Sequence, residues 1–201
     1  MKVSEAQPGC FGHPKKSTPM RKIVLVYGLI AGVILGAMFF VTAPLWDNGT
    51  LNFDNAMYVG YGTMVVSLSL VFFGVKSYRD NHKNGIITFG QGFKVGILIT
   101  LIACLLYALS WELAYHTVSK GFTAEMSKHY EQEIRKNAAN EVEMKEKLEQ
   151  SKKEMELYDS SFIFRFTITF LVEVFPVGLL ITLITAALLR NKNFLPASEP
   201  A

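Results

Sequence analysis

The sequence is poor in charge. Asp, Glu, Lys and Arg make up only 18% of its 201 residues, whereas 50% are hydrophobic. A soluble domain usually carries about 25% charged residues. Long runs almost free of charge alternate here with one segment dense in Lys and Glu. This shortage of charge, and a mean hydropathy of +0.26, argue against a soluble globular protein.

Cysteines and catalytic motifs are also scarce. Cys10 lies in the polar N-terminal stretch and Cys104 in an apolar run, so no disulfide framework and no cysteine-based metal site is predicted. Cys104 is expected to be a small packing residue. The sequence has no phosphate-binding glycine loop, no His-Glu-x-x-His and no nucleophile elbow. We therefore predict no catalytic residue, no resident metal and no cofactor, and we do not expect an enzyme.

The net charge of +3 is too small to indicate a nucleic-acid partner. No basic pattern with interleaved aromatic residues is present, and most cationic residues outside the Lys- and Glu-rich segment flank apolar runs. In that position Lys and Arg are typical of topology signals and of contacts with lipid headgroups. The lipid bilayer is therefore the first predicted partner.

Four apolar runs predict four transmembrane helices, since about 20 helical residues cross the hydrocarbon core. They cover about 23–44, 57–76, 93–116 and 162–189. The first run resembles a signal peptide, with a faint cleavage motif ending at Ala43. It is longer than a typical signal core, and Pro44 would follow the cut, so we expect it to be retained. The predicted fold class is an all-α polytopic membrane protein with a membrane domain over 23–192.

Polar tails flank this domain. Residues 1–22 are rich in Pro and Gly and predict a disordered tail, and 193–201 predict a short C-terminal tail. Met20 stands directly before Arg21 and Lys22, at the start of the first apolar run. We expect Met20 to be the natural start of translation.

The distribution of basic residues predicts the orientation. Lys and Arg flank both termini and fill the loop between the second and third runs, whereas the loop at 45–56 has two Asp and no base. The positive-inside rule places both termini and the middle loop in the cytoplasm. Four basic residues are predicted to face lipid headgroups or a partner at that surface: Lys76, Arg79, Lys83 and Lys94.

Small residues recur every fourth position in two runs. In a helix this spacing lines them up on one face, where a neighbouring backbone approaches closely. Two packing faces are predicted, and the sequence leaves open whether each neighbour belongs to the same chain or to another copy. The glycines concerned are Gly28, Gly32 and Gly36 in the first run, and Gly92 and Gly96 in the third, where Thr100, Cys104 and Ala108 continue the series.

Residues 117–161 differ in kind, with ten acidic and eight basic residues and no Pro. Apolar residues recur every four positions from Phe122 to Ile134, and then in heptad-like steps from Met144 to Phe162, with Ser151 as the polar exception. The stretch 137–140 separates the two patterns. We predict two antiparallel helices that extend the third and fourth spans out of the membrane. The alternative is a solvated charged linker.

Glu173 is the most prominent charge inside a span, and such groups suggest function. It lies about 17 Å into the fourth helix, at 1.5 Å per residue. Pro176 follows, frees the carbonyl of Val172 and predicts a kink. A carboxylate beside a kink suits a proton or cation site. The alternative is a neutral Glu173 bonded to a Ser, Thr or Tyr of another helix, with Thr63, Ser67, Ser69 and Thr100 available.

Two further charges lie near one end of the spans. Glu112 and Arg165 are expected at similar heights, and we predict a structural salt bridge between the third and fourth spans. His116 follows Glu112 by four residues and shares its helical face. That spacing begins a metal site, but no third ligand is fixed by the sequence, so no metal is predicted.

Several short motifs are similar to those of a known protein family. The stretches 73–80 (FGVKSYRD), 85–89 (GIITF) and 92–96 (GFKVG), together with 27–32 (YGLIAG), resemble the bacterial membrane-protein family catalogued as domain of unknown function 4199. The resemblance covers about 20–190. It implies a bacterial inner-membrane protein with four spans, and it supplies no catalytic residue.

Two functional hypotheses follow. The first is a non-enzymatic accessory, assembly or interaction protein of the inner membrane, which acts through contacts with a membrane protein partner. The glycine faces and the outward helical pair favour it. The second is a small proton- or cation-coupled transporter or oligomeric channel built around Glu173, which predicts a homo-oligomer.

Overall fold

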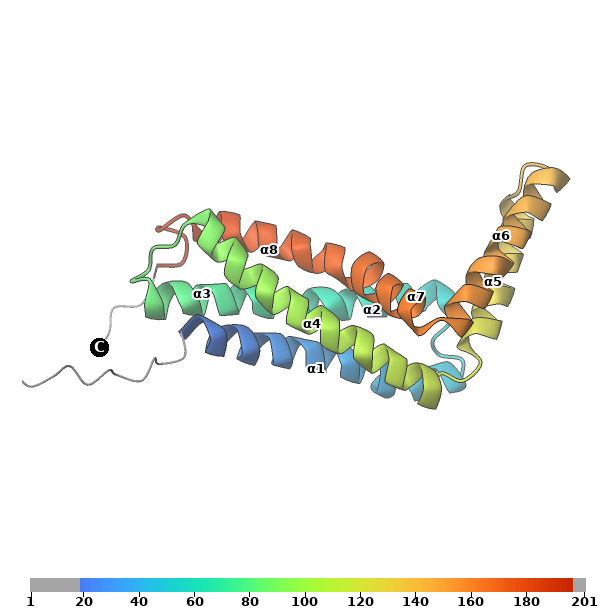
Figure 1. The fold of residues 1–201 in the computed structure, drawn as a ribbon, viewed down its shortest axis with the longest axis horizontal. Coiled ribbons are helices and arrows are strands. Elements are labelled where there is room, and N and C mark those ends of the chain that lie inside the picture. Colours follow the sequence, from blue (N-terminus) through green and yellow to red (C-terminus); the bar gives the residue numbers. More distant parts are fainter. Residues whose placement is uncertain (1–18, 197–201) are drawn as a thin grey trace, which may run out of the picture.

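The computed structural model describes residues 19–196, and every regular element within that range is a helix (Figure 1). Four helical segments are long and apolar enough to cross a membrane: Met20–Asp47, Phe53–His82, Phe89–Thr117 and Phe162–Leu189. The predicted all-α fold with four membrane-spanning helices is therefore confirmed. Each of the first three helices extends beyond the apolar run that predicted it.

The first span is the single helix α1 (Pro19–Asp47). A proline suits the first turn of a helix because the missing N–H has no partner there, and Arg and Lys are good helix formers. Residues 19–22 are therefore helical, and the prediction that the disordered tail extends to residue 22 is wrong over these positions. Residues 1–18 lie outside the described range.

The second span consists of α2 (Phe53–Leu68) and α3 (Leu70–His82), which meet at Ser69. The Ser69 hydroxyl donates a hydrogen bond to the carbonyl of Val66 at 2.6 Å, in competition with the helical ladder. At the other end, Asn52 and Asn55 form a reciprocal capping box. This polar cap starts the helix four residues before the predicted position 57.

The third span is α4 (Phe89–Thr117), which begins with a capping box between Thr88 and Gln91. The fourth comprises α7 (Phe162–Thr167), the π-helix η1 (Ile168–Val174) and α8 (Phe175–Leu189). Pro176 is the second residue of α8, and the N–H of Phe175 bonds to the carbonyl of Phe170 five residues back. Where a kink is predicted, the helix shifts to π-helical bonding just before the proline.

Both predicted glycine faces pack within this one chain, around α4. A Cβ on Gly28 would lie 2.8 Å from the Cβ of Ile102, and one on Gly32 would lie 2.7 Å from the Cβ of Leu106. Gly36 likewise faces Ser110. On the other side of α4, a Cβ on Gly96 would lie 2.8 Å from Thr182 of α8, and Gly92 meets Ala186. The small residues therefore allow α1 and α8 to approach α4 closely.

One end of the bundle carries the α3–α4 loop, the start of α1 and the end of α8 (Figure 1). Arg79 lies there and is 0% exposed, so the prediction that it faces lipid or a partner is wrong. Its guanidinium donates to Asp80 at 2.7 Å, to the carbonyl of Phe194 at 2.9 Å and to that of Leu195. The segment after α8 folds back over Arg79, because a guanidinium with five N–H donors binds such carbonyl groups well.

The other three basic residues remain accessible at this end. Lys76 is partly exposed and pairs with Asp80, Nζ to Oδ2 at 2.5 Å. Lys83 lies over the ring of Tyr78, and Lys94 is exposed on α4. Phe194 and Leu195 show that the predicted C-terminal tail is folded at its start, while residues 197–201 lie outside the described range.

The opposite end carries a helical hairpin of α5 (Phe122–Asn137) and α6 (Glu141–Ser160). The predicted pair of helices with a break at 137–140 is therefore confirmed. The hairpin does not continue the spans in a straight line, and Figure 1 shows it steeply inclined to the bundle. Gly121, at a φ of 90°, turns the chain after α4, and Ser161 breaks the helix between α6 and α7 with extended backbone.

Candidate functional site

A seam of polar and aromatic side chains joins the hairpin to the membrane bundle. We call it the polar seam. It lies between α4 and the chain that runs from the end of α6 into η1. Its members are Tyr107, Trp111, Glu112 and Tyr115 on α4, facing Tyr158, Asp159, Arg165, Thr169 and Glu173.

Glu112 and Arg165 form the predicted salt bridge. Arg165 Nε donates to Oε1 of Glu112 and Nη2 donates to Oε2, both at 2.8 Å. Arg165 is 2% exposed and Glu112 is 8% exposed. This is the two-pronged arrangement in which a guanidinium matches a carboxylate best. Each charge is thereby compensated inside the protein.

Arg165 also holds the end of the hairpin. Its Nη1 donates to the carbonyl of Tyr158 at 2.7 Å and to that of Asp159 at 3.2 Å. These carbonyls belong to the last turn of α6, where helical partners are missing. The guanidinium carbon also lies 4.1 Å from the ring centroid of Tyr115. One side chain thus joins α4, α6 and α7.

Further hydrogen bonds tie the same elements together. Trp111 Nε1 donates to the Tyr158 hydroxyl at 2.7 Å, and burial raises the pKa of that hydroxyl above its ordinary value of 10.0. The Tyr115 hydroxyl donates to Asp159, and it shares a 2.6 Å hydrogen bond with Thr123 at the start of α5. Tyr115 therefore links both hairpin helices to the end of α4.

Aromatic rings support the other side of the hairpin. The ring of Phe53, at the start of α2, stacks on His129 of α5 at 5.0 Å between centroids. Phe122 of α5 packs edge-on against Trp111 at 5.0 Å. The hairpin is therefore supported both by the polar seam and by the start of α2.

Glu173 lies at the inner end of the polar seam. Its Oε1 accepts a hydrogen bond from the hydroxyl of Tyr107 at 2.6 Å, and Tyr107 is 1% exposed. For a neutral Glu173, the sequence predicted a hydrogen bond to a Ser, Thr or Tyr of another helix. The partner is a tyrosine, whereas the four candidates named for it were Ser and Thr residues. Of these, Thr100 bonds to Thr182 of α8 at 3.0 Å and lies away from the carboxyl group.

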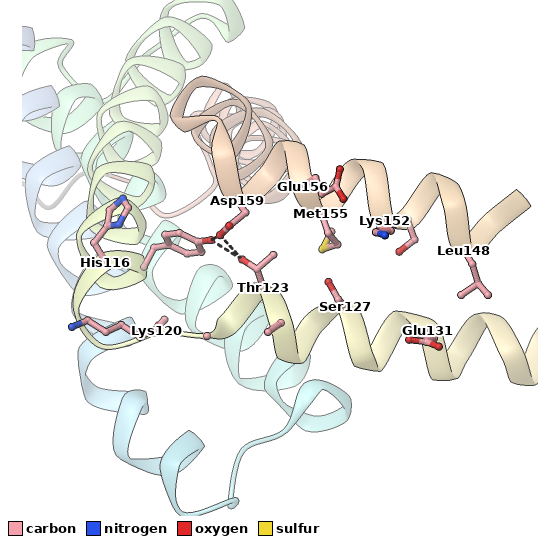
Figure 2. A pocket seen from close by; sticks show the side chains of 15 residues that line it. His116, Lys120, Thr123, Ser127, Glu131, Leu148, Lys152, Met155, Glu156 and Asp159 are labelled. Carbon is pink, nitrogen blue, oxygen red and sulfur yellow. Dashed lines mark hydrogen bonds between the residues drawn. The ribbon is translucent and has the colours of Figure 1, made fainter. Parts of the chain in front are cut away.

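An open groove of about 950 Å³ lies between α5 and α6, next to the outer end of the polar seam. Figure 2 shows Thr123, Ser127 and Glu131 of α5 on one wall, facing Leu148, Lys152 and Met155 of α6 on the other. Tyr115 and Asp159 close its inner end. The hairpin helices thus leave part of their facing surfaces uncovered.

His116 does not complete a metal site in the described part of the chain. Its Nε2 lies 3.8 Å from Oε2 of Glu112, whose two oxygens both bind Arg165. Between residues 19 and 196 no group of three His, Cys, Asp or Glu side chains is suitably placed for a metal ion. The 67% exposed imidazole instead lies at the rim of the groove.

The sequence reasoning missed most of the polar seam. It identified Glu112, Arg165 and Glu173 but not Tyr107, Trp111 or Tyr115 on α4. Each of these residues follows the previous one by four positions, so all three lie on one helical face. This spacing could have indicated an aromatic contact surface on α4. Tyr158 was interpreted only as an apolar heptad position.

Comparison with known proteins gives one result. The family model described as "Protein of unknown function (DUF4199)" matches residues 26–191, which is most of the chain. No match was found among curated proteins or among solved structures. The chain therefore belongs to the DUF4199 family of proteins of unknown function.

Proposed function

We propose that this protein is a non-enzymatic interaction protein of the bacterial inner membrane, which presents the α5–α6 hairpin to a partner protein. One observation carries the proposal: Arg165 fixes the hairpin to the bundle through Glu112 and through two carbonyls of α6. A mobile charged linker would need no such anchor. A hairpin held by buried hydrogen bonds is preorganised for binding, which lowers the entropic cost of association.

The proposed orientation places both termini in the cytoplasm and the hairpin on the opposite side. Basic residues at the bundle end away from the hairpin support it. The loop between α1 and α2, at the hairpin end, has Asp47 and Asp54 and no base. The hairpin itself carries many Lys, but its acidic residues outnumber them, and long segments contribute little to the rule.

We propose that the occupant of the groove is an amphipathic helix of the partner. Leu148 and Met155 supply apolar surface on the α6 wall, and the lining also carries charges of both signs, including Lys152 and Glu156. Helix-in-groove recognition uses such surfaces, with apolar anchors spaced three or four residues apart. The partner helix is expected to bear apolar residues on one face and charges of both signs beside them.

Site-specific photo-crosslinking in native membranes tests this proposal. A photoreactive side chain at Ser127, inside the groove, is expected to capture a partner protein, whereas the same group at Glu146, outside the groove, is not. Leu148→Glu is expected to abolish the adduct, and the matched Leu157→Glu, 46% exposed and outside the groove, is expected to retain it. Equal capture at both positions, or an adduct that survives Leu148→Glu, would overturn the proposal. Capture of only a second copy would instead indicate self-association.

A further inference from the structure

The two carboxyl groups of the polar seam are held differently. Glu112 receives two charge-assisted hydrogen bonds from Arg165. Glu173 is partly buried and receives one, from the neutral hydroxyl of Tyr107. Within residues 19–196 no Lys, Arg or His forms an ion pair with Glu173. Glu112 is therefore paired with an opposite charge, whereas Glu173 has no compensating charge.

The surroundings of Glu173 offer little else to stabilise a negative charge. The elements packed on η1 are α4, α7 and α8. The titratable groups facing Glu173 are Tyr107 of α4, which donates its hydrogen bond, and Tyr158 at the end of α6. Arg165 of α7 lies two helical turns from Glu173 and forms its ion pair with Glu112. The helix α8 contains no titratable residue. A carboxylate with one hydrogen bond in an apolar medium is costly, so this site favours the neutral group.

Polar groups lead from Glu173 towards the hairpin. Beyond Tyr107 come Tyr158 and Trp111, then the Arg165–Glu112 pair, and finally Tyr115 and Asp159 at the groove. Towards the other end, the described interior is mainly apolar. Thr100 and Thr182 bond to each other, and the buried hydroxyl of Ser67 on α2 has no hydrogen-bond partner among the described residues. Polar groups for proton exchange thus reach Glu173 from one side.

We propose that Glu173 is a proton-binding site that exchanges with the aqueous phase on the hairpin side only. On binding, an O–H bond forms at the carboxylate and one breaks at hydronium from the aqueous phase on the hairpin side. The reverse transfer returns the proton to the same side. Tyr107 is a positioning residue, which orients the carboxyl group. The π-helical turn η1 places this group on the face of the span that meets α4.

A hydrophobic carbodiimide tests this proposal, because it reacts with protonated carboxyl groups inside membranes. The full chain is reconstituted in lipid vesicles whose inner and outer pH are set separately. Intact-mass spectrometry and peptide mapping then follow the adduct on Glu173. We expect the labelling rate to fall when the hairpin side is made alkaline, by about tenfold per pH unit once the carboxyl group is mostly ionised. Changing the pH on the other side alone should leave the rate unchanged.

Two variants complete the experiment. Glu173→Gln should lose the adduct, and Tyr107→Phe should keep it while changing its pH dependence. The absence of an adduct on Glu173, or its control by the pH of the side away from the hairpin, would overturn the proposal. Equal control from both sides would also overturn it, and would instead favour a pathway through the membrane.

Discussion

Removal of the Arg165 side chain tests the anchor of the hairpin most severely. Glu112 is 8% exposed in the unchanged protein. In Arg165→Leu it loses both charge-assisted hydrogen bonds. Breaking a buried ion pair by removing one partner costs about 3–5 kcal/mol. The carbonyls of Tyr158 and Asp159 also lose their partner. We expect the free energy of unfolding in mixed micelles to fall by at least about 3–5 kcal/mol, since the lost carbonyl bonds add to the cost of the broken ion pair.

A double variant isolates the ion pair from the rest of the contact. Glu112→Leu combined with Arg165→Leu leaves no unpaired charge, so its main loss is two hydrogen bonds to carbonyls, about 2 kcal/mol in total. The double variant is therefore expected to be more stable than either single variant. Arg135→Leu, which removes an exposed pair with Glu131, serves as a control and should cost at most about 1 kcal/mol.

Limited proteolysis of the same variants reports the position of the damage. We expect Arg165→Leu to expose the α6–α7 junction around Ser161 to cleavage, since the guanidinium joins these helices. If Arg165→Leu costs less than about 1 kcal/mol, or if the effects of the two leucine substitutions simply add, Arg165 is not the anchor of the hairpin.

Three further predictions concern other parts of the molecule. Gly32→Leu should disrupt the packing of α1 on α4, seen as a loss of monodisperse protein on size-exclusion chromatography, whereas Gly60→Leu, with no atom within 4 Å of its Cβ position, should not. Arg79→Met should release the C-terminal segment and make it sensitive to carboxypeptidase, and unchanged resistance would contradict the role given to Arg79. The hydrogen bond from Lys153 lowers the pKa of Glu149 below 4.5. Its contribution is therefore present above pH 4.5 and lost as the pH falls through the lowered value, and circular dichroism should show a smaller helix loss there in Glu149→Gln than in the unchanged protein.

Much of the fold could be predicted because bilayer thickness and hydropathy fix the number of spans. Four apolar runs gave four helices, and the spacing of Gly28, Gly32 and Gly36 gave a packing face. The ends of the helices were less accurate. Polar residues such as Asn52 and Thr88 start helices outside the apolar runs, and hydropathy does not detect caps.

The candidate site was predicted only in part, because its partners are distant in sequence. The opposite charges of Glu112 and Arg165, and their similar expected heights in the membrane, were enough to predict their salt bridge. The burial of Arg79 depends on two backbone carbonyls from a segment more than a hundred residues away, and a carbonyl acceptor leaves no trace in the sequence. The steep turn of the hairpin likewise depends on the backbone conformations of Gly121 and Ser161.

The proposed orientation requires the hairpin to lie outside the cytoplasm and the termini inside it, and labelling of intact cells measures this directly. Single cysteines are introduced at Lys145 in α6 and at Lys83 in the α3–α4 loop, in a background without Cys10 and Cys104. An impermeant maleimide is expected to label position 145 in intact cells, and position 83 only after the inner membrane is permeabilised. The reverse pattern would place the hairpin in the cytoplasm and contradict the proposed orientation.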